Sequence, residues 1–166
     1  MTDLRIGYWS LFVSSQAVGA ATVHMDVWNG SERSITLTSL TAVKDGTVAV
    51  SGVVAAQLFL TRTTAEGTGG TSATSEGTST STIALTKLQT FALPSGITAR
   101  KTPTGGATAG AVICERQVVT EETNAANYEP VEFLTCGLVV PAGTGIRVVQ
   151  GSVASVGSLG FGAAFY

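Results

Sequence analysis

Short runs of alternating apolar and polar residues, separated by Gly, Pro, Asn and Asp, limit the possible folds of this chain more than any other feature. Residues 22–28 are a clear example, because Val23, Met25 and Val27 fall on one face of an extended chain. Comparable runs recur about every ten to fifteen residues, with turn residues between them. No long stretch has the period of an amphipathic helix. The pattern predicts a chain built from β-strands.

The turn residues predict how some of these strands are joined. Asn29-Gly30 follows the run 22–28, and Asp45-Gly46 follows a second alternating run. Asn and Gly tolerate the positive φ angles that tight turns require. The order strand, Asn-Gly, strand, Asp-Gly, strand is typical of a meander. We therefore expect these strands to pair as hairpins.

The strongest strand signal is Val53–Thr64. Both of its faces carry bulky side chains, because Leu58 and Leu60 alternate with Phe59. This strand is therefore expected to lie between two layers or beneath a neighbouring subunit. Further strands are predicted at residues 6–13, 83–88, 112–120, 131–140, 146–150 and 159–165.

Together these strands predict an all-β fold, an antiparallel β-sandwich with jelly-roll or Greek-key connections. The length of 166 residues suits one domain. Residues 1–8 are expected to form an N-terminal arm or first strand, and residues 9–166 the single sandwich domain. Within it, the Ser/Thr/Gly-rich segment 66–82 is predicted to be an exposed flexible loop, since it can bury little apolar surface.

Composition argues against several classes of function. Only 12% of the residues are charged and the net charge is −2, so no basic stripe for nucleic acid can be assembled. No apolar run reaches the length of a membrane span, and the N-terminus shows no secretory signal. We therefore expect synthesis in the cytoplasm and a protein that binds neither nucleic acid nor membrane. A small-molecule ligand is not expected either.

His24 is the only histidine of the chain. The alternation places it on the face opposite the expected core, together with Asp26 two residues later. A catalytic site needs several convergent groups, and no Ser, Cys or carboxylate relay accompanies this pair. We interpret His24 and Asp26 as structural neighbours, and we predict no catalytic residue.

One group of glutamates is the main concentration of acidic side chains. Paired carboxylates can hydrolyse glycosides, and carboxylates with backbone carbonyls can bind Ca²⁺. The spacing fits no known calcium loop, so we interpret the group as a solvated acidic loop, with a weak divalent-cation contact as the alternative. No metal site and no cofactor are predicted. The glutamates are Glu115, Glu121, Glu122, Glu129 and Glu132.

The two cysteines, Cys114 and Cys136, are not spaced as a metal or redox motif. We interpret them as small buried residues. A bridge is the alternative if their strands are adjacent, although a reducing cytoplasm disfavours it. The glycines Gly67, Gly69 and Gly70 lack the following helix that a phosphate-binding loop requires.

Aromatic residues offer one further candidate site. A platform of Trp and Tyr rings could stack sugars, but these residues are dispersed along the chain. Anchoring in the core or in an interface is the preferred interpretation. The residues are Tyr8, Trp9, Trp28, Tyr128, Phe161 and Tyr166.

Several stretches resemble virion structural proteins of tailed bacteriophages. The C-terminal run 137–150, with Pro141-Ala142-Gly143 at its turn, and the terminal residues 160–166 are similar to the last hairpin and closing strand of jelly-roll trimers. The resemblance covers the general character of the C-terminal two-thirds and carries over no functional residue. The other stretches are 62–64, 87–90, 93–100 and 103–108.

This resemblance implies a non-enzymatic component of a virus particle. Its simplest form is a capsid decoration (cement) protein, a homotrimer that is seated on the major capsid protein of the phage head. The N-terminal segment 1–8 would then reach a neighbouring subunit. An alternative is a receptor- or glycan-binding jelly-roll module of a phage tail or baseplate. A glycan hydrolase is the third and least favoured interpretation.

Overall fold

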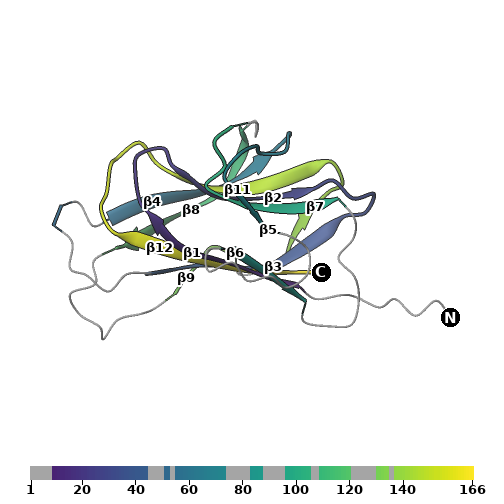
Figure 1. Ribbon diagram of the computed structural model, residues 1–166, viewed down its shortest axis with the longest axis horizontal. Helices are drawn as coiled ribbons and strands as arrows, with labels where there is room; N and C mark the ends of the chain where they lie inside the picture. Colours follow the sequence, from purple (N-terminus) through teal and green to yellow (C-terminus); the bar gives the residue numbers. More distant parts are fainter. Residues whose placement is uncertain are drawn as a thin grey trace.

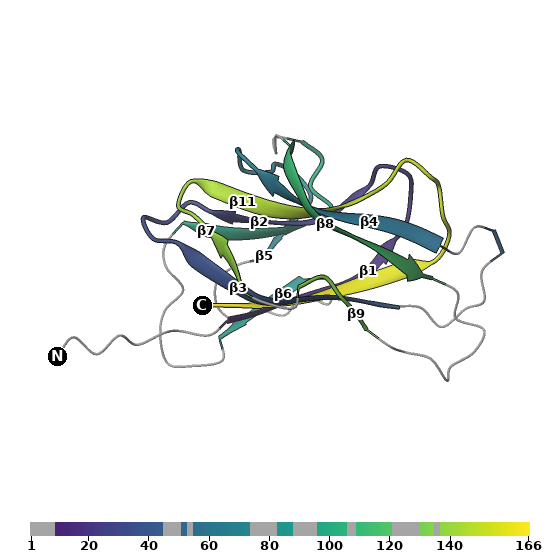
Figure 2. The same cartoon turned by 180° about the vertical axis from the view of Figure 1, so that it is seen from behind.

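The computed structural model describes residues 9–44, 51–52, 55–73, 83–87, 96–105, 109–120, 130–134 and 137–166. These residues form two antiparallel six-stranded sheets that pack face to face (Figure 1). The view from behind shows the same two layers (Figure 2). No helix occurs in these ranges. The prediction of an all-β antiparallel sandwich is confirmed.

Sheet A has the strand order β10-β3-β12-β1-β6, and β9 also pairs with β3. Its strands are β1 (Trp9–Ala17), β3 (Ile35–Lys44), β6 (Ile83–Lys87), β9 (Val131–Glu132), β10 (Leu138–Val140) and β12 (Ser158–Phe165). Sheet B has the order β5-β7-β2-β11-β4-β8. Its strands are β2 (Val23–Asn29), β4 (Ala55–Thr63), β5 (Thr71–Ala73), β7 (Ile97–Lys101), β8 (Ala109–Val119) and β11 (Thr144–Gln150).

The strand pairs are nested along the chain. β1 pairs with β12, β2 with β11, β3 with β10 and β4 with β8, and all four pairs are antiparallel. The chain changes sheet after each of its first strands, so the nested pairs wrap around one core. This arrangement is a jelly roll. The strands β5, β6 and β7 are inserted between β4 and β8, and they extend the two sheets beside β1 and β2.

The predicted hairpin between β2 and β3 is wrong, because these strands belong to different sheets. The side chain of Asn29 stabilises the crossing: its Nδ2 donates hydrogen bonds to the carbonyls of Arg33 and Val140. Its Oδ1 accepts a hydrogen bond from the Ser31 hydroxyl. These bonds hold the chain between β2 in one sheet and β3 in the other, so the turn residues make a crossing between the layers instead of a hairpin. The second predicted turn, at residues 45–46, lies outside the described residues.

The core is filled by the inward faces of both sheets. Leu58 and Leu60 of β4 are fully buried, as the alternation predicts, and so is Phe161 of β12. Two strands were not predicted: β5, which falls in the predicted loop 66–82, and β7, in which Ile97 and Ala99 alternate and are buried. The five residues of β7 lie between a turn and a Pro/Gly-rich stretch, so their alternation is too short to predict a strand from sequence.

The predicted loop 66–82 is ordered in its first part. Glu66–Ala73 is largely exposed, but β5 within it pairs with β7, and the Thr68 N–H donates to the Gly105 carbonyl at 2.7 Å. Backbone pairing with the sheet supplies the stabilisation that its few apolar side chains cannot. Residues 74–82 lie outside the described residues, as does the predicted arm 1–8.

The outer strand β8 is tied to sheet A by an arginine. Arg116 Nε donates to the Glu132 carbonyl at 2.8 Å, and Nη2 donates to the Phe133 carbonyl at 3.3 Å. An inward-pointing charge of this kind also discourages another strand from adding to a sheet edge. Arg116 therefore bridges the two sheets at one side of the sandwich.

We expect Arg116→Ala to lower the free energy of unfolding by about 1 kcal/mol, because two carbonyls lose a charged donor at a partly solvated site. Urea denaturation would measure the loss. Arg116→Lys is the control, since it keeps the charge but not the forked geometry, and it should recover only part of the stability. An alanine variant as stable as the wild type would contradict the bridging role.

Candidate functional site

A β-bulge in β2 decides where the chain's histidine lies. Met25 is opposite Val148 of β11 and Val23 is opposite Val149, so His24 is an extra residue without a partner in the register. A bulge of this kind turns two successive side chains toward the same face. His24 therefore points into the core beside Met25, and its exposed fraction is 0%. The prediction that His24 lies on the face opposite the core is wrong.

His24 is surrounded by a small buried polar network. Its Nε2 lies 3.3 Å from Gln150 Oε1, which also accepts a hydrogen bond from the Gly19 N–H. Gln150 Nε2 in turn donates to the Ser155 hydroxyl at 2.6 Å. Among the described residues, His24 Nδ1 has no hydrogen-bond partner. The network joins β2 and β11 to the neighbouring loops, which is a structural role.

Burial lowers the pKa of His24 to about 4, and the hydrogen bond to Gln150 opposes this shift only in part. Its ring also packs on Phe161, with ring centroids 5.3 Å apart. Asp26 lies on the other face of the same strand, so the two residues form no catalytic pair. The prediction that His24 and Asp26 share one face is therefore wrong, and His24 is a neutral residue of the core.

Asp26 belongs instead to a charged row on the outer face of sheet B. The strand register places Arg100 of β7 and Arg147 of β11 directly opposite Asp26, one on each side. Beyond them, Ser72 of β5 is opposite Arg100, and Thr61 of β4 is opposite Arg147. The row Ser72–Arg100–Asp26–Arg147–Thr61 thus crosses five strands. No sequence motif announces it, because its members are up to 121 positions apart on the chain (147 − 26 = 121).

The carboxylate of Asp26 is buried, with an exposed fraction of 2%. Among the described residues, neither of its oxygens makes a hydrogen bond of good geometry. Loss of hydration raises the pKa of Asp26 to about 6, and the charge of Glu66 adds to this rise. The charges of Arg100 and Arg147 and the backbone N–H of Arg100 oppose it.

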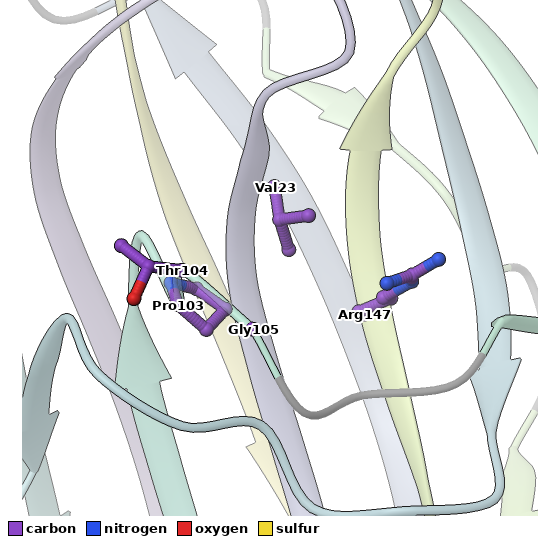
Figure 3. Close-up of a pocket in the computed structure, with 5 residues that line it drawn as sticks. All are labelled: Val23, Pro103, Thr104, Gly105 and Arg147. Atoms are coloured by element: carbon purple, nitrogen blue, oxygen red, sulfur yellow. The ribbon is translucent and has the colours of Figure 1, made fainter.

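A shallow pocket of about 150 Å³ lies next to this row. Figure 3 shows Val23 and Arg147 on neighbouring strands, beside Pro103, Thr104 and Gly105. The volume is below the roughly 300–1,000 Å³ that is usual for drug-sized ligands. This pocket is therefore too small to enclose a ligand of that size.

The two candidate glutamates that the structure describes, Glu115 and Glu132, lie on strands of different sheets. Glu115 is exposed on β8 and accepts a hydrogen bond from Gln57, whereas Glu132 is exposed on β9 of the other sheet. Glu121, Glu122 and Glu129 lie outside the described residues. Within the described ranges, no group of His, Cys, Asp and Glu has the geometry to hold a metal ion.

Of the two cysteines, Cys114 lies among the described residues. Cys114 of β8 is a free thiol that packs against the core, and its Sγ donates to the Phe133 carbonyl at 3.3 Å. Burial raises the pKa of this thiol. Cys136, the other member of the possible bridge, lies outside the described residues.

The glycine tract has a packing role. Gly67 is buried, and a side chain there would overlap the carboxylate of Asp26. Gly69 and Gly70 have positive φ angles of 67° and 66°, which glycine adopts most easily. These residues therefore allow the loop to lie close to the sheet.

The four candidate aromatic residues that the structure describes do not lie together as a sugar-binding platform. Trp9 and Phe161 are buried in the core. Trp28 is half-buried in sheet B, and Tyr166, which is 38% exposed, follows β12 of sheet A. Tyr8 and Tyr128 lie outside the described residues.

The outer face of sheet A, as the alternation of β1, β3, β10 and β12 presents it, is mostly uncharged among the described residues. Phe12 of β1, opposite Gly162 in the register, is 50% exposed, and so is Val139 of β10 at the other side of the surface. Lys44 at the end of β3 and Glu132 on β9 are charged residues at its margin. The described side chains of this surface, called here the sheet A face, are Ser10, Phe12, Thr36, Thr38, Ser39, Thr41, Val139, Gly162 and Ala164.

Comparison with known proteins identifies no relative of this chain. In the described part of the chain, no helix is long and apolar enough to cross a membrane. No protein-family model, no curated protein and no solved structure matches the sequence or the fold. A proposal for its function therefore depends on the residues and the geometry.

Proposed function

We propose that this chain is a non-enzymatic structural protein of a virus particle, a decoration protein that stabilises a phage head. It associates as a homotrimer and binds the major capsid protein. The sequence resemblance to virion proteins of tailed phages motivates the proposal, and the jelly-roll order of the strands is compatible with it.

The observation that carries the proposal is the sheet A face. Among its described residues, the hydroxyl, glycine and alanine side chains carry no charge near the exposed ring of Phe12. Copies of one chain carry the same charge at every position, so an uncharged face is the one on which a copy is not repelled. An aromatic ring among small residues is a common anchor of protein interfaces.

The outer face of sheet B is less suited to contact between copies. It carries Arg100, Arg147 and Glu66, and its one described pocket is small. The alternative function, a receptor- or glycan-binding module, would need a pocket or groove large enough to hold its ligand. The sheet A face therefore favours assembly over ligand recognition.

Phe12→Asp tests the proposal. We expect the wild-type chain to sediment as a trimer and Phe12→Asp as a monomer, because a charge at the centre of an apolar contact must lose its hydration. Analytical ultracentrifugation measures the mass, and electron microscopy of the parent particle measures occupancy on the head. The matched control is Val112→Asp on β8 of sheet B, where the wild-type side chain is 58% exposed; it should remain trimeric.

Two results would contradict this proposal in different ways. A wild-type chain that is monomeric and absent from the head would refute the decoration function. A trimer that survives Phe12→Asp but dissociates on Val112→Asp would keep the function and show that the interface lies on sheet B.

A further inference from the structure

The segment Glu66–Ala73, called here the strap, lies across the outer face of sheet B above Asp26. Gly67 is in contact with the carboxylate of Asp26, as shown by the overlap that any side chain at this position would make. The strap is held at its middle by Thr68, whose N–H donates to the Gly105 carbonyl at 2.7 Å and whose carbonyl accepts from the Thr104 N–H at 2.9 Å. It thus covers Asp26 without bonding to it.

The side chain of Arg100, on β7, binds the strap at both of its ends. Its Nη1 donates to the Ser72 hydroxyl at 2.8 Å, and its Nη2 lies 3.2 Å from Glu66 Oε1. Glu66 Oε1 also accepts a hydrogen bond from the Thr98 hydroxyl at 2.8 Å. Among the described residues, the buried Nε of Arg100 has no partner. Both side-chain contacts of this guanidinium are therefore made to the strap.

Asp26 is the cross-strand neighbour of Arg100 and competes for the same cation. Three charged groups act on it from the elements packed around it: Arg100 of β7, Arg147 of β11 and Glu66 of the strap. The ionised carboxylate is unfavourable beneath the strap, because water is excluded and Glu66 carries the same charge. When Asp26 is protonated and neutral, Arg100 keeps its contacts with Glu66 and Ser72.

We propose that the strap is a pH-responsive cover, which is closed while Asp26 is protonated and loosens when Asp26 ionises and draws Arg100 away from Glu66 and Ser72. The pKa of about 6 places this change between weakly acidic and neutral solution. The inference depends on sheet B alone, so it holds or fails independently of the proposed assembly through the sheet A face.

Amide hydrogen exchange measured by NMR tests the proposal. If Asp26 recovers an ordinary pKa when the strap opens, the opening equilibrium of the strap should be about tenfold larger at about pH 7.5 than at about pH 5. The amide of Thr68 should lose protection by this factor after correction for intrinsic exchange, relative to the amide of Val148 in the centre of sheet B. Protection that stays the same at both pH values in the wild type would overturn the proposal.

Two variants separate the role of Asp26 from general effects of pH. Asp26→Asn should keep the strap protected to the same degree at both pH values, because its amide cannot ionise. Glu132→Gln, an exposed carboxylate on β9, is the control and should retain the tenfold change. If Asp26→Asn does not fold, Glu66→Gln replaces it, and it should weaken protection of Thr68 at pH 5. A pH response that persists in Asp26→Asn would overturn the proposal.

Discussion

Phe161→Ala is expected to lower the free energy of unfolding by about 3–5 kcal/mol, the range typical of removing a buried aromatic ring. Phe161 has an exposed fraction of 0% and lies on β12, between Val13 of β1 and Ala42 of β3. Its ring contacts His24 across the sandwich. The substitution would leave a cavity at the point where the two sheets meet, next to a histidine that has few polar partners.

Phe12→Ala is the matched control for this prediction. It makes the same chemical change on the neighbouring strand, but Phe12 is 50% exposed on the sheet A face. We expect it to change the stability of the subunit by less than about 1 kcal/mol. Urea denaturation at a fixed protein concentration compares the two variants. Equal losses for Phe161→Ala and Phe12→Ala would mean that the assigned inward face of β12 is wrong.

The second large effect is a pair of opposite pH dependences. The pKa of His24 is lowered from 6.5 to about 4, so its contribution to stability is present above pH 6.5 and is lost as the pH falls toward 4. The pKa of Asp26 is raised from 3.8 to about 6, so its contribution is present below pH 3.8 and is lost as the pH rises through 6. Each shift corresponds to at most about 3 kcal/mol.

Between about pH 4 and pH 6 the two contributions oppose each other, and single variants separate them. In His24→Gln, only Asp26 still acts, so stability relative to the wild type should increase as the pH falls through this range. In Asp26→Asn, only His24 acts, and stability should decrease relative to the wild type. Urea denaturation at several pH values measures both slopes. Slopes of the same sign in the two variants would contradict the assigned burial of one residue.

The side chains that face the core were largely predictable from the alternating pattern. Leu58 and Leu60 are buried as expected, and so are Leu159 and Phe161. A strand has a period of two residues, so the pattern identifies one face from local sequence alone. This local rule failed at His24, because one inserted residue in β2 shifts the alternation and only the register with β11 reveals it.

Strand pairing was much less predictable. Asn29-Gly30 has the composition of a hairpin turn, yet the chain crosses there from sheet B to sheet A. A turn signal specifies local backbone angles, but it does not specify which strand lies next to which. The pairing of β2 with β11 and β7 depends on contacts between residues that are far apart in sequence.

The amino-acid sequence by itself determined the all-β sandwich and most of the inward-facing side chains, since both follow from composition and from a two-residue period. Only the tertiary structure decided that Asp26 lies between Arg100 and Arg147 beneath the strap, and that Phe12 is exposed beside the small residues of β12 on the sheet A face. These neighbours come from separate strands, and the register of the sheets, which is set by packing around the shared core, brings them together.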